Sequence, residues 1–85
     1  MQTANAGSVF QNPAGDFAAR LIDAAGLKNF SIGGARVSPK HANFIENQGD
    51  ATSLQIEEVI QYIKKTVKKI HGVELTLEIK IVGER

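Results

Sequence analysis

The sequence predicts an α+β domain in two layers, a β-α-β-β-α-β arrangement with two helices on one face of a small mixed or antiparallel sheet. Two segments show a helical period of apolar residues, at 16–25 and 53–70. Apolar and polar residues alternate strictly over residues 73–81, as in a half-buried strand. Eighty-five residues are enough for one small domain, so we expect residues 1–85 to form a single domain.

The first strand is predicted at residues 8–10 and ends before Pro13, because proline has no N–H to donate to a β-ladder. The first helix follows at 16–25, and apolar residues recur along it at Phe17, Leu21 and Ala24, with Ala18, Ile22 and Ala25 beside them. Asp16 favours the positive end of this helix, and Gly26 is typical of a left-handed C-terminal cap.

The middle of the chain predicts short extended runs. Residues 30–37 read as a strand that is interrupted by Gly33 and Gly34, which indicates either a bulge or a place where another backbone or a ligand comes close. A turn at 38–40 precedes a short strand at 43–45, and a second turn follows at 47–50.

The second helix, 53–70, carries the strongest signals. Thr52 and Gln55 form a capping-box pattern. One apolar stripe is predicted to face the core and comprises Ile56, Val59, Ile60, Ile63, Val67 and Ile70. We interpret the lysines near the end of the helix as a solvated face that complements the helix dipole, and Gly72 as the point where the helix stops.

In a split β-α-β arrangement the first and last strands are neighbours in the sheet. Ser8 and the polar side of the last strand, which includes Glu78, would then share the face that the helices leave uncovered. Val9 would point toward the helices and Phe10 away from them. An open face that carries Phe10 and Val82 would require a partner domain or a ligand.

Composition and net charge argue against several classes of function. The formal net charge of +1 argues against nucleic-acid binding, which normally needs a basic excess. No apolar run approaches the length of a membrane span, and no cysteine is present, so we expect a soluble, cytoplasmic domain without disulfides or cysteine-zinc sites. From spacing alone, Ser8 is either a strand hydroxyl or a catalytic group, Glu78 is by default a solvated carboxylate, and His41 has no second ligand at metal spacing.

Five segments carry a resemblance to one enzyme family. Residues 5–13 (NAGSVFQNP) are similar to the signature AGSxFxNP of UDP-N-acetylenolpyruvoylglucosamine reductase, also called UDP-N-acetylmuramate dehydrogenase. Residues 24–28 resemble its helix end, and residues 32–38 and 40–45 resemble its segment IGGAxVSxKHANFI. Residues 72–83 resemble GVxLxPEVRIIG, with Leu77 where that family usually has proline.

The resemblance implies the C-terminal, substrate-binding domain of the reductase, with the N-terminal FAD-binding domain absent. The family uses FAD and NADPH to convert UDP-N-acetylglucosamine enolpyruvate into UDP-N-acetylmuramate for peptidoglycan. The resemblance implies that Ser8 donates a proton, that Glu78 supports the enolic intermediate, and that Asn12, His41 and Asn43 bind the UDP-sugar. The alternatives are a purely turn-forming role for Asn12, and for the segment that holds His41 and Asn43 a role in bracing the pocket only. The isolated chain is predicted to hold no FAD and to oxidise no NADPH.

Two other interpretations remain open at this stage. The element order also fits a non-catalytic, ferredoxin-like module that binds RNA or a protein partner, although the chain lacks the aromatic pair on which such modules stack bases. A sheet face bared by loss of the other domain would instead allow self-association.

Overall fold

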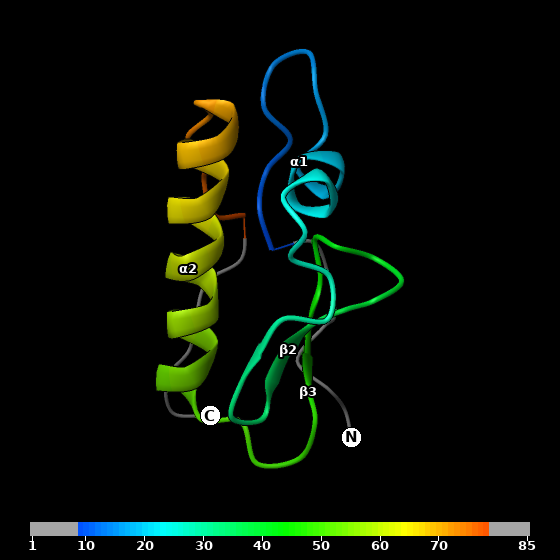
Figure 1. Cartoon of the computed structure of the whole chain (residues 1–85). Helices are drawn as coiled ribbons and strands as arrows, with labels where there is room; N and C mark the ends of the chain where they lie inside the picture. The colour runs from blue at the N-terminus through cyan, green and yellow to red at the C-terminus, as the bar shows by residue number, and fades with distance from the viewer. Residues whose placement is uncertain (1–8, 79–85) are drawn as a thin grey trace.

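The computed structural model describes residues 9–78, and within them it has the predicted α+β architecture (Figure 1). Its elements, in chain order, are α1 (Ala18–Ala24), β1 (Ser31–Ile32), β2 (Ala35–Val37), β3 (Ile45–Asn47) and α2 (Ser53–His71). The long helix α2 packs against β1, β2 and α1. In Figure 1, α2 stands beside the small sheet, and α1 is seen nearly along its axis.

The three strands form an antiparallel sheet in the order β1-β2-β3. Gly33 and Gly34 make the tight turn between β1 and β2, so residues 30–37 form a hairpin rather than one interrupted strand. A Cβ atom built on Gly34 would lie 2.6 Å from the backbone nitrogen of Ala51, which is too close for any side chain. Of the two readings of this glycine pair, close approach of another backbone is therefore confirmed, and a bulge is not.

The first and last described segments lie side by side, as predicted. Phe10 and Leu77 form an isolated antiparallel bridge. The Gln11 amide donates to the Thr76 carbonyl oxygen, and the Glu78 amide donates to the Val9 carbonyl oxygen, each over 2.8 Å. Ser8 and Val82, which the sequence placed on the same sheet face, lie outside the described residues.

The prediction that Phe10 points to an open face is wrong. Val9 and Phe10 are 3% and 1% exposed, and both side chains belong to the hydrophobic core. The reason is a segment distant in sequence: Asn43 hydrogen-bonds to the backbone of both residues, and this brings the loop before β3 against them. The 9–11 segment therefore has a neighbour on each edge.

Helix α1 is shorter than the predicted 16–25 and begins only after Phe17. Phe17 precedes the helix with an extended backbone, so it does not share the buried stripe and is 64% exposed. The buried residues of α1 are Ala18, Leu21 and Ile22. Gly26 has the predicted left-handed conformation, with a φ of 77°.

At both ends of helix α2 the predicted capping residues are confirmed. The two hydrogen bonds of the Thr52–Gln55 capping box are present, and Gly72 ends the helix in the left-handed conformation. Four residues of the predicted stripe are buried, namely Val59, Ile60, Ile63 and Val67, and Ile56 is partly buried. Ile70 is 54% exposed, so its predicted burial is wrong. The next residue, His71, faces α1 instead, and successive helical residues point about 100° apart.

The core joins both helices to the sheet and to the paired end segments. From α2, Ile60 and Ile63 are each 1% exposed, and from the segment that follows it Leu75 is 2% exposed. Leu75 is buried while Glu74 and Thr76 are exposed, so the predicted alternation holds in the described part of the last strand. Between residues 9 and 78, neither helix combines the length and the apolar character that crossing a bilayer requires.

Candidate functional site

A groove of about 370 Å³ lies between the start of α1 and residues 38–44, which we call the groove loop and which connect β2 to β3. The residues that line the groove are Asn12, Phe17, Ala19, Arg20, Asp23, Lys28, Lys40, His41, Ala42, Asn43 and Phe44. All three residues predicted to bind substrate, Asn12, His41 and Asn43, are among them. The fold thus brings together residues that are about 30 positions apart in the sequence.

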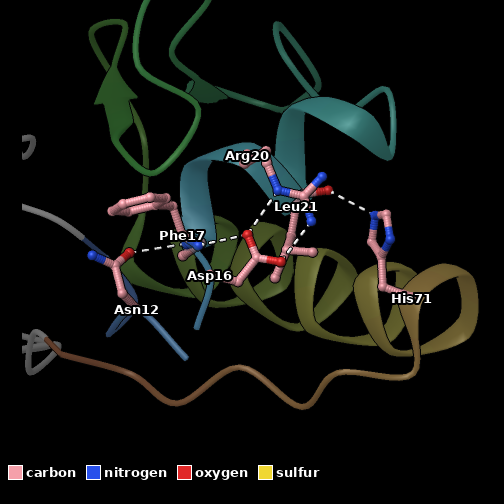
Figure 2. A network of polar contacts seen from close by, with 7 residues as sticks. Asn12, Asp16, Phe17, Arg20, Leu21 and His71 are labelled. Atoms are coloured by element: carbon pink, nitrogen blue, oxygen red, sulfur yellow. Dashed lines mark hydrogen bonds and ion pairs between the residues drawn. The ribbon is translucent and has the colours of Figure 1, made fainter. Parts of the chain in front are cut away.

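Asn12 stands at the end of the groove where α1 begins. Its Oδ1 atom accepts a hydrogen bond of 2.9 Å from the amide of Ala18, the first residue of α1 (Figure 2). Asp16 accepts a 2.7 Å bond from the Phe17 amide, so the two side chains together satisfy the first free amides at this helix terminus. Asn12 is exposed, and its side-chain nitrogen remains available to a ligand.

The groove loop is held from within by Ser38. This serine is 3% exposed, and its Oγ accepts hydrogen bonds of 3.1 Å from the amides of both Lys40 and His41. The Phe44 amide donates to the His41 carbonyl oxygen over 2.9 Å. The rings of His41 and Phe44 lie 5.4 Å apart at 41°. The loop therefore presents the exposed imidazole of His41 on a hydrogen-bonded frame.

Asn43 is placed differently from Asn12 and His41, because it is only 6% exposed. Its Oδ1 accepts from the Phe10 amide over 3.0 Å, and its Nδ2 donates to the Phe10 carbonyl oxygen over 2.9 Å. Its backbone carbonyl oxygen accepts from the Val9 amide over 2.8 Å. Asn43 thus belongs to the groove lining, while both polar groups of its side chain bind the segment that follows Ser8.

The charges of the groove favour an anionic ligand. Arg20, Lys28 and Lys40 supply three cations against the single carboxylate of Asp23. Arg20 is engaged by Asp16, and Lys28 lies 3.7 Å from Asp23. Within the described residues no carboxylate lies within ion-pair distance of Lys40, whose charge acts on the Glu46 carboxylate from farther away, and Lys40 is exposed next to His41. No sequence signal singles out Arg20 and Lys28, whereas Lys40 belongs to residues 40–45, the segment that resembles KHANFI.

The Asp16 carboxylate accepts hydrogen bonds from the Arg20 guanidinium and from the Phe17 amide. These bonds, that of Arg20 first, lower the pKa of Asp16 from 3.8 to about 2. Asp16 therefore stays ionised at every pH at which the domain would work. In the described part of the chain, no group of three or more histidine, aspartate or glutamate side chains is placed to hold a metal ion.

Glu78, predicted to be catalytic, is outside the groove lining. Its side chain is exposed, and its backbone amide is bonded to Val9, the neighbour of Ser8. Ser8 itself lies outside the described residues, so the distance between the two predicted catalytic side chains stays untested. The register nevertheless places Glu78 opposite the residue next to Ser8, and Asn43 connects that segment to the groove.

Comparison with known proteins gives a consistent result. The C-terminal domain of UDP-N-acetylenolpyruvoylglucosamine reductase, as a family, matches residues 1–82. The reductase of Nitrosospira multiformis is 62% identical over 79 residues, which are 93% of this chain and 23% of that protein. The reductase of Coxiella burnetii is 57% identical over 77 residues, 91% of this chain and 24% of that protein.

A solved structure agrees with these relatives. The crystal structure of the reductase from Thermus caldophilus matches with a TM-score of 0.71 and 39% identity, over 87% of this chain and 26% of that one. The chain spans about a quarter of the length of the proteins it matches. Family match, sequence identity and fold agree, and the chain belongs to the UDP-N-acetylenolpyruvoylglucosamine reductase family, as its C-terminal domain.

Proposed function

We propose that the chain is the substrate-binding domain of a cytoplasmic reductase that converts UDP-N-acetylglucosamine enolpyruvate into UDP-N-acetylmuramate for peptidoglycan synthesis. The observation that carries the proposal is the groove, in which Asn12, His41 and Asn43 meet although they come from two separate segments. The family to which the chain belongs is named for this reductase.

The groove suits part of a UDP-sugar. A diphosphate is a dianion, and the unpaired Lys40 and the neighbouring His41 offer it a cation and a ring N–H. Asn12 adds an amide donor at the other end. The Ser38 hydrogen bonds already hold the backbone of Lys40 and His41, so the loop itself loses little freedom on binding, which favours affinity.

We assign the chemical step to Ser8 and Glu78. In a protein of the relatives' full length, bound FAD would supply the reducing chemistry, as a hydride for the enolpyruvyl methylene carbon, and none of residues 9–78 is assigned to holding it. Ser8 gives a proton to the adjacent carbon. Glu78 supports the enolic intermediate. The assignment rests on the family to which the chain belongs, and the bond between the Glu78 amide and the Val9 carbonyl oxygen brings the Glu78 backbone next to the neighbour of Ser8.

Serine is a weak acid, so this proton transfer requires a strongly basic, carbanion-like carbon and a site that stabilises the alkoxide or restores its proton. Preorganised charge in a pocket that excludes water provides such stabilisation. Glu78 is exposed in this chain. We therefore propose that the flavin domain of the complete enzyme closes over Ser8 and Glu78 when substrate is bound.

The test of the groove is an NMR titration of the ¹⁵N-labelled chain with UDP-N-acetylglucosamine enolpyruvate. We expect shifts at Asn12, Lys40 and His41, and at Ser8 and Glu78 once the enolpyruvyl group is present. UDP alone, as the matched control, should shift the groove signals without those of Glu78. Saturating ligand that leaves all groove signals in place would refute the proposal.

The test of the chemistry uses the complete reductase in rapid-reaction kinetics. Ser8→Ala should leave reduction of FAD by NADPH unchanged and slow reoxidation of the flavin by substrate by a factor of roughly 10² or more. Normal reoxidation in that variant would remove Ser8 from the proton-transfer step.

A further inference from the structure

We infer that Asn43 is a positioning residue, which locks the groove loop to the segment that follows Ser8 and so fixes bound substrate relative to Ser8 and Glu78. The inference rests on the proposed function for its consequence. Its geometry is independent of that function, because it consists of three hydrogen bonds between residues that are 33 and 34 positions apart.

The Asn43 carboxamide binds the backbone of a single residue. It pairs with both polar groups of one backbone residue, because Oδ1 accepts from the Phe10 amide at 3.0 Å and Nδ2 donates to the Phe10 carbonyl oxygen at 2.9 Å. One side chain thereby acts as a β-strand neighbour would. It is 6% exposed, so water does not readily replace either bond.

On its opposite edge, the 9–11 segment is bonded to the segment that carries Glu78. The Val9 carbonyl oxygen and the Gln11 amide bond to Glu78 and Thr76, each over 2.8 Å. The polar groups of Phe10 and the Val9 amide thus face Asn43, whereas the Val9 carbonyl oxygen and the Gln11 amide face the segment that carries Glu78. The 9–11 segment is held between the two, so a shift at Asn43 is passed directly to Glu78.

The groove loop also carries the residues that we propose to bind substrate. Lys40 and His41, which we propose to bind the diphosphate, are fixed through the Ser38 hydroxyl. One short loop therefore carries both the wall that binds substrate and the clamp on the 9–11 segment. A carboxamide is required because it is donor and acceptor at once, and neither a carboxylate nor an aliphatic group is both.

The experiment is amide hydrogen exchange on the 85-residue chain, with Asn43→Asp as the variant and Asn47→Asp as the matched control. Asn47 also bonds backbone amides through Oδ1, those of Gly49 and Ala51, but it lies away from the groove. We expect Asn43→Asp to speed exchange at Phe10 and Glu78 at least tenfold more than at Ile63 in α2. Asn47→Asp should leave Phe10 and Glu78 unchanged relative to Ile63.

A second readout separates positioning from mere stability. On titration with UDP-N-acetylglucosamine enolpyruvate, Asn43→Asp should still show the His41 shift and should lose the Glu78 shift. Equal Glu78 responses in variant and wild type, or Glu78 exchange that follows Ile63, would overturn the inference. If the wild type itself shows no groove shifts, the proposed function is refuted, and with it the catalytic consequence. Amide hydrogen exchange would still decide whether Asn43 holds the 9–11 segment.

Should Asn43→Asp fail to fold, the wild type decides the question. Phe10 and Glu78 amides held by one clamp must open together, so their exchange should depend on urea in the same way. Exchange of Glu78 through a separate opening, with a different urea dependence from that of Phe10, would overturn the inference.

Discussion

At the scale of single residues, hydrogen bonds from neighbouring groups change the properties of polar side chains in this domain. The ion pair of Asp16 and Arg20 is an example, since it lies at the start of α1 and beside the groove (Figure 2). The guanidinium and the Phe17 amide favour the charged carboxylate and lower the pKa of Asp16 to about 2. Because the folded state holds the proton more weakly than the unfolded chain, this contribution to stability is present above about pH 4 and disappears as the pH falls toward 2.

Arg20→Gln should raise the pKa of Asp16 toward its ordinary value of 3.8, because the hydrogen bond from Arg20 is the largest cause of the lowered pKa. NMR titration of the Asp16 carboxyl carbon measures this directly. Lys28→Gln is the control, as it removes a groove cation that interacts with Asp23 instead. An unchanged Asp16 pKa in Arg20→Gln would show that the ion pair does not persist in solution.

At the scale of elements, one glutamine ties the hairpin to the long helix. The Oε1 of Gln55 accepts from the Thr52 amide over 3.1 Å as part of the capping box, and from the Gly34 amide in the β1–β2 turn over 3.2 Å. The turn comes this close to Gln55 because Gly33 has no side chain, since a Cβ atom there would collide with the Gln55 carboxamide. The capping box therefore stabilises not only α2 but also the position of the sheet on it.

Gln55→Ala should lower the free energy of unfolding by about 1–2 kcal/mol, because it leaves the Thr52 and Gly34 amides without this acceptor. Gln55→Glu keeps the acceptor at a helix N-terminus and should remain close to the wild type. Urea denaturation followed by circular dichroism compares the two variants. Equal loss in both would mean that the amide group itself, and not its role as acceptor, is required.

At the scale of the whole molecule, stability depends on which face of α2 the rest of the chain covers. Ile63 and Ile70 lie on the same helix, seven residues apart, and were expected to share one stripe. Ile63 is 1% exposed in the core, whereas Ile70 is 54% exposed. The helix end is held by His71 instead, whose Nε2 lies 3.1 Å from the Leu21 carbonyl oxygen of α1 (Figure 2).

Ile63→Val should destabilise the domain by about 0.5–1.5 kcal/mol, because it removes a buried methyl group from a packed core. For a domain of this size that lowers the Tm by several degrees. Ile70→Val makes the same chemical change at an exposed site and should stay within about 0.5 kcal/mol of the wild type. Calorimetry that finds the larger effect at Ile70 would contradict the packing described for α2.

The features that depend only on neighbours in the chain could be predicted from the amino-acid sequence. The capping box at Thr52, the stop at Gly72 and the period of α2 are local, since they need only residues within a few positions of one another. The pairing of the two end segments also followed, from the element order, whereas the close approach at Gly34 was only one of the alternatives that the glycine pair left open. The family was evident from ordered motifs.

Which distant groups meet is set by tertiary packing. No spacing rule relates Asn43 to Phe10, so the sequence left open whether Asn43 binds substrate or only braces the pocket, and it placed Phe10 on an open face. The exposure of Phe17 and Ile70, and the gathering of Arg20, Lys28 and Lys40 in one groove, were likewise fixed by packing. Periodicity states which residues of one element share a face, but which faces are covered is set by chain segments far away in the sequence.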